Sequence, residues 1–209
     1  MPESLSCFAR GSHVRETLAP LILFAAVMSL TPGPNIVMVT ASAANFGFRR
    51  VIPHMLGITV GFAIMVVAMG LGLLGLVQAA PRAHTLVKYA GALYLLYLAW
   101  RIARADANGA AALVRPIGFI EAALFQWINP KGWVFALGAL ATYTTVGGDL
   151  LRETSVTALV LATACLGSVA IWAGFGVVIG RFLGNPRIRR AFNRTMAALL
   201  AFSLVPVVW

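Results

Sequence analysis

Charged side chains are scarce in this sequence. Of its 209 residues, 11% are aspartate, glutamate, lysine or arginine, while 60% are hydrophobic. A soluble domain carries roughly a quarter charged residues, because polar side chains must cover its water-facing surface. The composition excludes an ordinary soluble domain and indicates an integral membrane protein, short enough to form one compact bundle.

Cysteine and histidine are rare as well. The two cysteines, Cys7 and Cys165, lie far apart, which excludes a disulfide framework and a CxxC metal pair. The three histidines (His13, His54 and His84) lack the spacing of a zinc-protease motif. We therefore expect no metal and no cofactor.

Acidic residues are the scarcest charged type, six against sixteen lysines and arginines, which leaves a formal net charge of +10. A nucleic-acid-binding protein can have such a charge, but these arginines lie between apolar blocks and not on one folded face. Contact with lipid headgroups and control of topology explain them better. The expected partner is a lipid bilayer, and no nucleic acid.

Long apolar runs are what the sequence has in abundance. About 20 apolar residues cross the hydrocarbon core of a bilayer as a helix. Six runs are candidates: Leu18–Asn45, Met55–Val77, Leu86–Ile102, Ile117–Tyr143, Ser155–Gly180 and Thr195–Trp209. The runs show no period-2 alternation, so we predict an all-α membrane protein with six transmembrane helices and no strands.

The links between these runs are polar and short, at residues 47–53, 78–85, 101–116, 144–154 and 181–194. No link is long enough for a soluble domain. Residues 17–209 are therefore expected to form a single transmembrane domain, and residues 1–16 a poorly ordered N-terminal extension.

Basic residues predict the orientation. The side that holds the N-terminus carries five (Arg10, Arg15, Arg82, Lys88, Arg152), and the opposite side carries ten (Arg49, Arg50, Arg101, Arg104, Arg115, Arg181, Arg187, Arg189, Arg190, Arg194). Cytoplasmic loops are enriched in lysine and arginine. Both termini are thus predicted outside a bacterial cytoplasmic membrane, although Arg10 and Arg15 beside the first span favour the opposite orientation.

Two of the apolar runs are interrupted by turn residues. The first contains Thr-Pro-Gly-Pro-Asn at positions 31–35, and the fourth contains Asn-Pro-Lys at positions 129–131. Proline breaks a helix and glycine adds conformational freedom. Freed backbone groups are tolerated at membrane depth only where they face protein or a water-filled cavity.

The two interruptions occupy equivalent places in a 3+3 division, with half-repeats at about residues 17–103 and 115–209. Because each half has three spans, the second half must be inverted relative to the first. Inverted repeats with broken helices at the midplane are typical of secondary transporters. A single proline is often only a kink, but two matched interruptions, each with an asparagine, favour a binding site.

Lys131 is the most informative side chain, because a buried ammonium at membrane depth costs several kcal/mol unless it is paired or hydrated. It could neutralise the carboxylate of an amino-acid substrate. The alternative is a pair with Glu121, but ten residues separate the two, about 15 Å along a straight helix. We expect Glu121 at a solvated position near the cytoplasmic interface.

Asn35 and Asn129 could hold the ammonium or carboxylate of a substrate, or cap the helix halves that follow them. Gln126 lies one turn before Asn129 and could share that face or bond another helix. Gly57 and Gly61 are expected to let helices approach closely. The candidate substrate-binding residues are Pro32, Gly33, Pro34, Asn35, Gln126, Asn129, Pro130 and Lys131.

The sequence resembles the LysE/RhtB family of amino-acid exporters over nearly the whole chain after residue 17. The resemblance is carried by TPGPN at 31–35, GFRRVIPHMLGITVG at 47–61, YAGALYLLYLAWRI at 89–102 and QWINPKGW at 126–133. It is strongest toward the exporters of cysteine and O-acetylserine and toward the homoserine/threonine branch. It implies a six-span exporter of small amino acids, coupled to the proton gradient.

Other functions stay open at this point. A metal-cation exporter of the same broad superfamily would need clustered histidines, cysteines or carboxylates. An intramembrane enzyme would need a nucleophile and a base, and no such pair is visible, so we expect no enzyme. A channel subunit would have no evident use for two matched breaks.

The residue that carries the proton is left open by the sequence. The proton could be carried by Glu121, by His54, by Lys131 or by the substrate. The glycine-lined helix faces are compatible with a homodimer.

Overall fold

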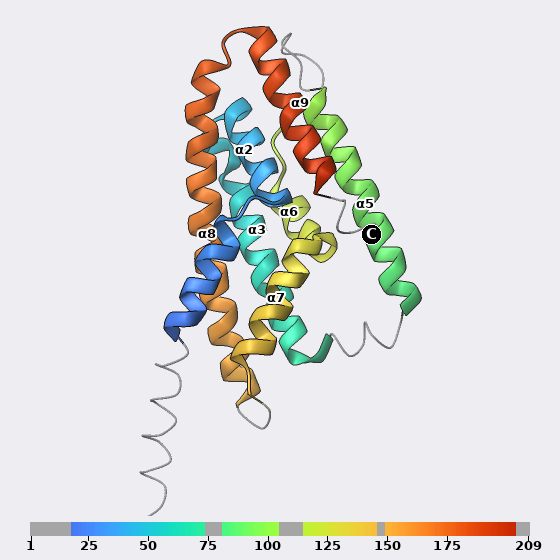
Figure 1. Cartoon of the computed structure of the whole chain (residues 1–209), viewed down its shortest axis with the longest axis vertical. Coiled ribbons are helices and arrows are strands. Elements are labelled where there is room, and N and C mark those ends of the chain that lie inside the picture. The colour runs from blue at the N-terminus through green and yellow to red at the C-terminus, as the bar shows by residue number, and fades with distance from the viewer. Residues whose placement is uncertain (1–17, 74–80, 105–114, 146–148, 204–209) are drawn as a thin grey trace, which may run out of the picture.

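The computed structural model describes residues 18–73, 81–104, 115–145 and 149–203. Every element in these ranges is a helix (Figure 1). The predicted extension at residues 1–16 lies outside the described residues. The all-helical prediction is confirmed for the part of the chain that is described.

The described residues of the first half form five helical segments. They are a helix at Leu18–Leu30 (helix 18–30), α2 at Pro34–Phe46, α3 at Phe48–Ala68, a π-helical turn η1 at Met69–Leu73, and α5 at Pro81–Ala103. Helix 18–30 and α2 are bent by 56° relative to each other at the Thr31–Gly33 break. At the α2–α3 corner only Gly47 separates the helices, with a φ of 81° that favours glycine.

The described part of the second half also contains an interrupted helix followed by a long one. It contains α6 at Phe119–Phe125, a 3-10 turn η2 at Gln126–Ile128, α7 at Pro130–Tyr143, α8 at Leu150–Phe182 and α9 at Pro186–Phe202. Asp149 begins α8 by accepting a hydrogen bond from the Arg152 amide, and Asn185 begins α9 in the same way. Two helices, Phe48–Gly72 and Leu150–Phe182, are each long and apolar enough to cross a bilayer, and the bent pair of helix 18–30 and α2 qualifies as a third.

Several helix boundaries differ from the sequence expectation. The link expected at residues 47–53 is mostly the first turns of α3, with Pro53 inside the helix. The link expected at residues 181–194 shrinks to the three residues between α8 and α9, so the helix expected from Thr195 starts at Pro186. Hydropathy measures the apolar part of a helix, whereas arginine-bearing turns continue the same helix beyond it.

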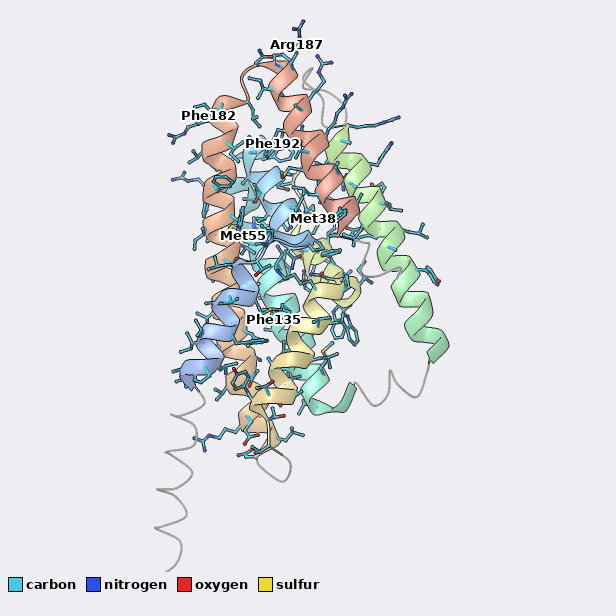
Figure 2. All side chains as sticks on the ribbon, in the orientation of Figure 1. Met38, Met55, Phe135, Phe182, Arg187 and Phe192 are labelled. Carbon is cyan, nitrogen blue, oxygen red and sulfur yellow. The ribbon has the colours of Figure 1, made fainter. Side chains whose placement is uncertain are left out.

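The helices pack into two apolar clusters on opposite sides of the breaks. α3 packs against α2, α6 and α8, and α5 packs against α9 (Figure 1). One cluster includes Met38 and Met55, and the other includes Phe135, which lies on the far side of the break from them (Figure 2). Between the two clusters lie the polar residues of both interruptions.

Arginines gather at one end of the bundle, where Arg187 and Phe182 are found (Figure 2). The α2–α3 corner, the last turn of α5, the last turn of α8 and the first turns of α9 all reach this end (Figure 1). Two of these arginines lie over aromatic rings: the guanidinium carbon of Arg104 is 4.7 Å from the centre of the Trp100 ring, and that of Arg101 is 5.7 Å from the Tyr97 ring. Aromatic and basic side chains together are typical of a membrane–water interface.

Gly57 and Gly61 bring α3 against α6. A Cβ on Gly61 would lie 2.6 Å from both Cα and the carbonyl oxygen of Ala123, and one on Gly57 would overlap the Phe119 carbonyl oxygen. Both faces are closed by backbone, which cannot move aside as a flexible side chain can. The prediction that these two glycines serve helix packing is confirmed.

We predict that Gly61→Ala lowers the stability of the protein by about 1–3 kcal/mol, because the added methyl overlaps α6 backbone. Gly174→Ala is the matched control, since no atom of the described residues lies within 4 Å of a Cβ built there. Thermal unfolding of the two purified variants in detergent measures the difference. Equal midpoints would show that α3 and α6 are not in close contact.

Candidate functional site

The first interruption leaves the last carbonyl groups of helix 18–30 without partners in their own helix. The Thr31 amide and hydroxyl both donate back to the Val27 carbonyl, at 3.2 and 2.7 Å. Gly33 then runs extended, with φ of −163°, and α2 begins at Pro34. This φ is open to any residue, so the backbone conformation alone does not require glycine at position 33.

The second interruption has a similar form. The η2 turn follows α6, and Asn129 is extended, with φ of −84° and ψ of 105°. Helix α7 then begins with Pro130, so a proline occupies the first position of the helix half after each break. Proline suits this position because the missing N–H would have had no partner within the helix.

Side chains join the two interruptions across 91 residues of sequence. The Asn35 amide donates to Gln126 Oε1 at 2.8 Å, and the Gln126 amide donates to Asn35 Oδ1 at 3.3 Å. Gln126 is fully buried and also donates to the Ala122 carbonyl. Asn35, at the start of α2, therefore does not cap its own helix; it links the first break to the second.

Lys131 makes the second link between the breaks. Its ammonium donates to the carbonyl oxygen of Thr31, at the end of helix 18–30. The side chain passes directly over Gly33, where an added Cβ would lie 2.6 Å from Lys131 Cδ. Glycine at position 33 leaves room for the lysine side chain in this position, and a larger residue there would make the lysine side chain shift.

Helix α8 supplies donors to the neighbouring carbonyl groups. The Ser168 hydroxyl donates to the Ser29 carbonyl at 2.7 Å, and Trp172 Nε1 donates to the Leu30 carbonyl at 3.3 Å. Together with Lys131 they satisfy three consecutive carbonyls at the end of helix 18–30. In an apolar surrounding each of these groups would otherwise be costly to leave unpaired.

A cavity of about 50 Å³ lies where the breaks meet. Six of the candidate residues line it: Gly33, Pro34, Asn35, Gln126, Asn129 and Lys131. Pro32 and Pro130 belong to the breaks but not to the lining, and Pro32 is exposed. The other lining residues, not among the candidates from the sequence, are Met28, Ser29, Ile36, Phe62, Gly132, Phe135, Cys165, Ser168 and Val169.

Two helix N-termini adjoin this cavity, those of α2 and α7. Within the described residues, neither has a side-chain cap, although Asn129 occupies the capping position of α7. The amides of the second and third positions, Asn35 and Ile36 in α2 and Lys131 and Gly132 in α7, have no carbonyl in their own helix to bond. Such amides favour an anion, assisted by the helix dipole.

Two buried polar atoms at the cavity have no hydrogen-bond partner among the residues described. They are Oδ1 of Asn129, a residue only 2% exposed, and Oγ of Ser29. An amide oxygen accepts and a hydroxyl can accept or donate, so both can accept a hydrogen bond from an ammonium. The cavity thus combines groups suited to a carboxylate with groups suited to an ammonium.

Glu121 lies outside this site and does not pair with Lys131. Its Oε1 accepts from the Tyr94 hydroxyl at 2.9 Å and from Arg101 at 3.3 Å, and Arg115 lies 3.9 Å from Oε2. Glu121 is partly buried in this ion-pair cluster at the arginine-rich end, not simply solvated as the sequence suggested. His54, on α3, is fully buried, and neither ring nitrogen has a hydrogen-bond partner in the described part of the chain.

Metal-ligating side chains do not converge within the ranges that the structure describes. No group of three or more histidine, cysteine, aspartate or glutamate side chains is close enough to hold one ion. Cys165 is a free thiol at the cavity wall.

Comparison with known proteins identifies relatives over most of the chain. The model of the family described as LysE type translocator matches residues 26–207. A cysteine/O-acetylserine efflux protein of Klebsiella pneumoniae is 30% identical over 193 residues, which cover 91% of this chain and 96% of the relative. The protein of the same name from Escherichia coli K12 is 30% identical over 182 residues, covering 86% and 89%.

A third relative, the cysteine/O-acetylserine efflux protein of Shigella flexneri serotype 5b, is 29% identical over 196 residues, covering 90% of this chain and 96% of the relative. No solved structure matches the chain.

We predict that Asn35→Ala and Gln126→Ala are energetically coupled. Either substitution removes the same link between the breaks, so the double variant should be less destabilised than the sum of the singles, by about 0.5–2 kcal/mol. Unfolding of the four proteins in mixed detergent measures this coupling.

Thr163→Ala serves as the independent partner in a control cycle, because its exposed hydroxyl bonds only the Leu159 carbonyl of its own helix. The effects of Asn35→Ala and Thr163→Ala on the free energy of unfolding should be additive. Additive effects for Asn35 and Gln126 as well would contradict a direct link between the two breaks.

Proposed function

Because the chain belongs to the LysE-type translocator family, we propose that it exports small amino acids or close derivatives, such as cysteine or O-acetylserine, from the cytoplasm. The observation that carries this proposal is the meeting of two interrupted helices at a cavity lined by Asn129, Lys131 and other polar residues of both breaks. A zwitterion needs an anion site and a cation site within a few ångströms of each other. The cavity offers both.

The substrate carboxylate is proposed to bind at the start of α7, beside Lys131. A lysine in the first turn of a helix is unfavourable with respect to the helix dipole, because both are positive. A bound carboxylate removes this conflict and bonds the free amides at the same time. One of the three N–H groups of the Lys131 ammonium donates to the Thr31 carbonyl. This hydrogen bond holds the ammonium in place, and the other two N–H groups can donate to the substrate.

The substrate ammonium is proposed to bind Asn129 Oδ1 and Ser29 Oγ. Both atoms are buried and without a partner among the described residues, so an ammonium there would satisfy them. Asn35 and Gln126, by contrast, satisfy each other and are proposed to position the two breaks. Gly33 and the prolines Pro32, Pro34 and Pro130 shape the backbone around the site.

The fold is proposed to be six spans in a 3+3 inverted repeat, with half-repeats at about residues 17–103 and 115–209. Each half contributes one interrupted helix, and the pairs α3–α8 and α5–α9, equivalent elements of the two halves, pack against each other. A pseudo-twofold axis through these pairs would relate the two breaks. Alternate opening of the two apolar clusters would then expose the cavity to each side in turn.

The arginine-rich end is proposed to face the cytoplasm of a bacterial cell, with both termini outside the inner membrane. Coupling to the proton gradient and assembly as a homodimer are further parts of this proposal.

The proton coupling can be tested directly. Collapse of the gradient with a protonophore should stop export against a concentration difference. A rate unchanged by the protonophore would contradict proton coupling.

We predict that Lys131→Met lowers export at least about tenfold, a loss of transition-state stabilisation of about 1.4 kcal/mol or more. The measurement is efflux of labelled cysteine or O-acetylserine from preloaded vesicles, normalised to protein amount. Arg181→Gln is the control, because this exposed cation lies at the end of α8 and away from the cavity. Normal export by Lys131→Met would contradict the role of the ammonium.

We also predict that Gly33→Ala lowers export at least about tenfold. The added methyl occupies the path of the lysine side chain and forces the ammonium away from Thr31. Gly167→Ala is the matched control, with no described atom within 4 Å of its Cβ. If both alanine variants export equally well, the lysine does not depend on the space at position 33.

A further inference from the structure

The cavity is lined by apolar residues as well as polar ones. Phe62 of α3 and Phe135 of α7 line it, together with Met28 and the thiol of Cys165 on α8. The polar groups described above account for the amino and carboxyl groups that all amino acids share. Discrimination among amino acids must come from the remaining wall.

Phe62 and Phe135 form a fixed part of that wall. Their rings stack with centres 5.2 Å apart and planes at 27°, and the residues are only 3% and 5% exposed. The Phe24 ring supports Phe135 from another side, at 5.6 Å. Buried rings held on two sides cannot rotate away without disturbing the surrounding core.

Phe135 follows Lys131 by one helical turn on α7, so the two side chains project from the same face of that helix. A substrate whose carboxylate lies at Lys131 therefore directs its side chain along α7 toward Phe135. Phe62 follows Gly61, whose contact with Ala123 of α6 fixes the position of α3. The backbone positions from which the lysine and the two rings project are thus set by packed helices.

The charge of the cavity lining also restricts which substrates can bind. Among the described lining residues, Lys131 is the single charged side chain. A lysine or arginine substrate would place a second cation in the same cavity, and an aspartate or glutamate substrate would bring a second carboxylate. A buried charge without its own partner is strongly unfavourable.

We propose that the Phe62–Phe135 pair, with Cys165, forms the subsite for the substrate side chain and restricts export to amino acids with short, uncharged side chains. The cavity is small, about 50 Å³ in all, which suits a short side chain better than a branched or aromatic one. This inference rests on the proposed function, since it concerns the same site. What it adds to the proposed function is the identity of the residues that select the substrate.

The test is a competition panel in which vesicles preloaded with equimolar cysteine, O-acetylserine, methionine, leucine, phenylalanine and arginine are sampled for export. Wild type should favour cysteine and O-acetylserine. Phe135→Ala should raise methionine and leucine relative to cysteine by about tenfold, the discrimination expected for one or two methylene groups in an apolar pocket. Arginine should stay excluded, because the substitution adds space and no negative charge.

Two further variants keep the test decisive if Phe135→Ala does not fold. Phe135→Leu removes less of the wall and should shift the selectivity in the same direction by a smaller factor. Cys165→Leu narrows the subsite and should reduce export of O-acetylserine more than that of cysteine. Phe182→Ala, at a ring 72% exposed at the end of α8, is the control and should leave the selectivity unchanged.

The outcomes separate the two proposals. If wild type exports none of the amino acids in the panel, the proposed function is wrong. If wild type exports cysteine but Phe135→Leu and Cys165→Leu change all substrates by the same factor, the function stands and the subsite inference is overturned. A shift in selectivity of opposite sign for the widening and the narrowing variant supports the inference.

Discussion

The structure depends on how the backbone groups of a helix that stops within the bundle are satisfied. Helix 18–30 ends with carbonyls that have no partner in their own helix, and three donors from elsewhere in the chain bond them: Ser168, Trp172 and Lys131. Two of these come from α8 and one from α7, so the end of the first helix half is held by the second half of the chain. The same contacts that make the interruption tolerable also bring the ammonium of Lys131 to the cavity.

The uncharged residues that hold the two breaks together differ from the residues that have polar atoms available for a ligand. Asn35 and Gln126 are complementary amides that satisfy each other, and they hold the two breaks together without a charge. Asn129 and Ser29 keep polar atoms without partners among the described residues, beside helix N-termini that have no side-chain caps there. Unsatisfied groups are usually costly in a protein interior, so the presence of two such atoms at this cavity is a physical reason to regard it as a binding site.

Sequence reasoning located the interruptions but not what surrounds them. Proline and asparagine within apolar runs were visible signals, and six of the eight candidate residues line the cavity. Phe62 and Phe135 could not be found this way, because a phenylalanine in an apolar helix looks the same whether it faces lipid, core or cavity. Ser168 offered a weak signal as a polar residue in an uncharged run. Gly33 was assigned conformational freedom, whereas its φ is ordinary and its missing side chain leaves space for a lysine side chain 98 positions away.

The α2–α3 corner has a mechanical consequence. A single glycine joins the two helices, so there is no flexible loop to absorb a change in their relative position. Tilting α2 about the Thr31–Gly33 break would therefore pull directly on the first turn of α3, whose far portion carries one of the aromatic rings at the cavity. A rotation of α2 would therefore displace α3 and the ring that it carries at the cavity. Binding in the cavity and movement of the arginine-rich end of the bundle would then be coupled.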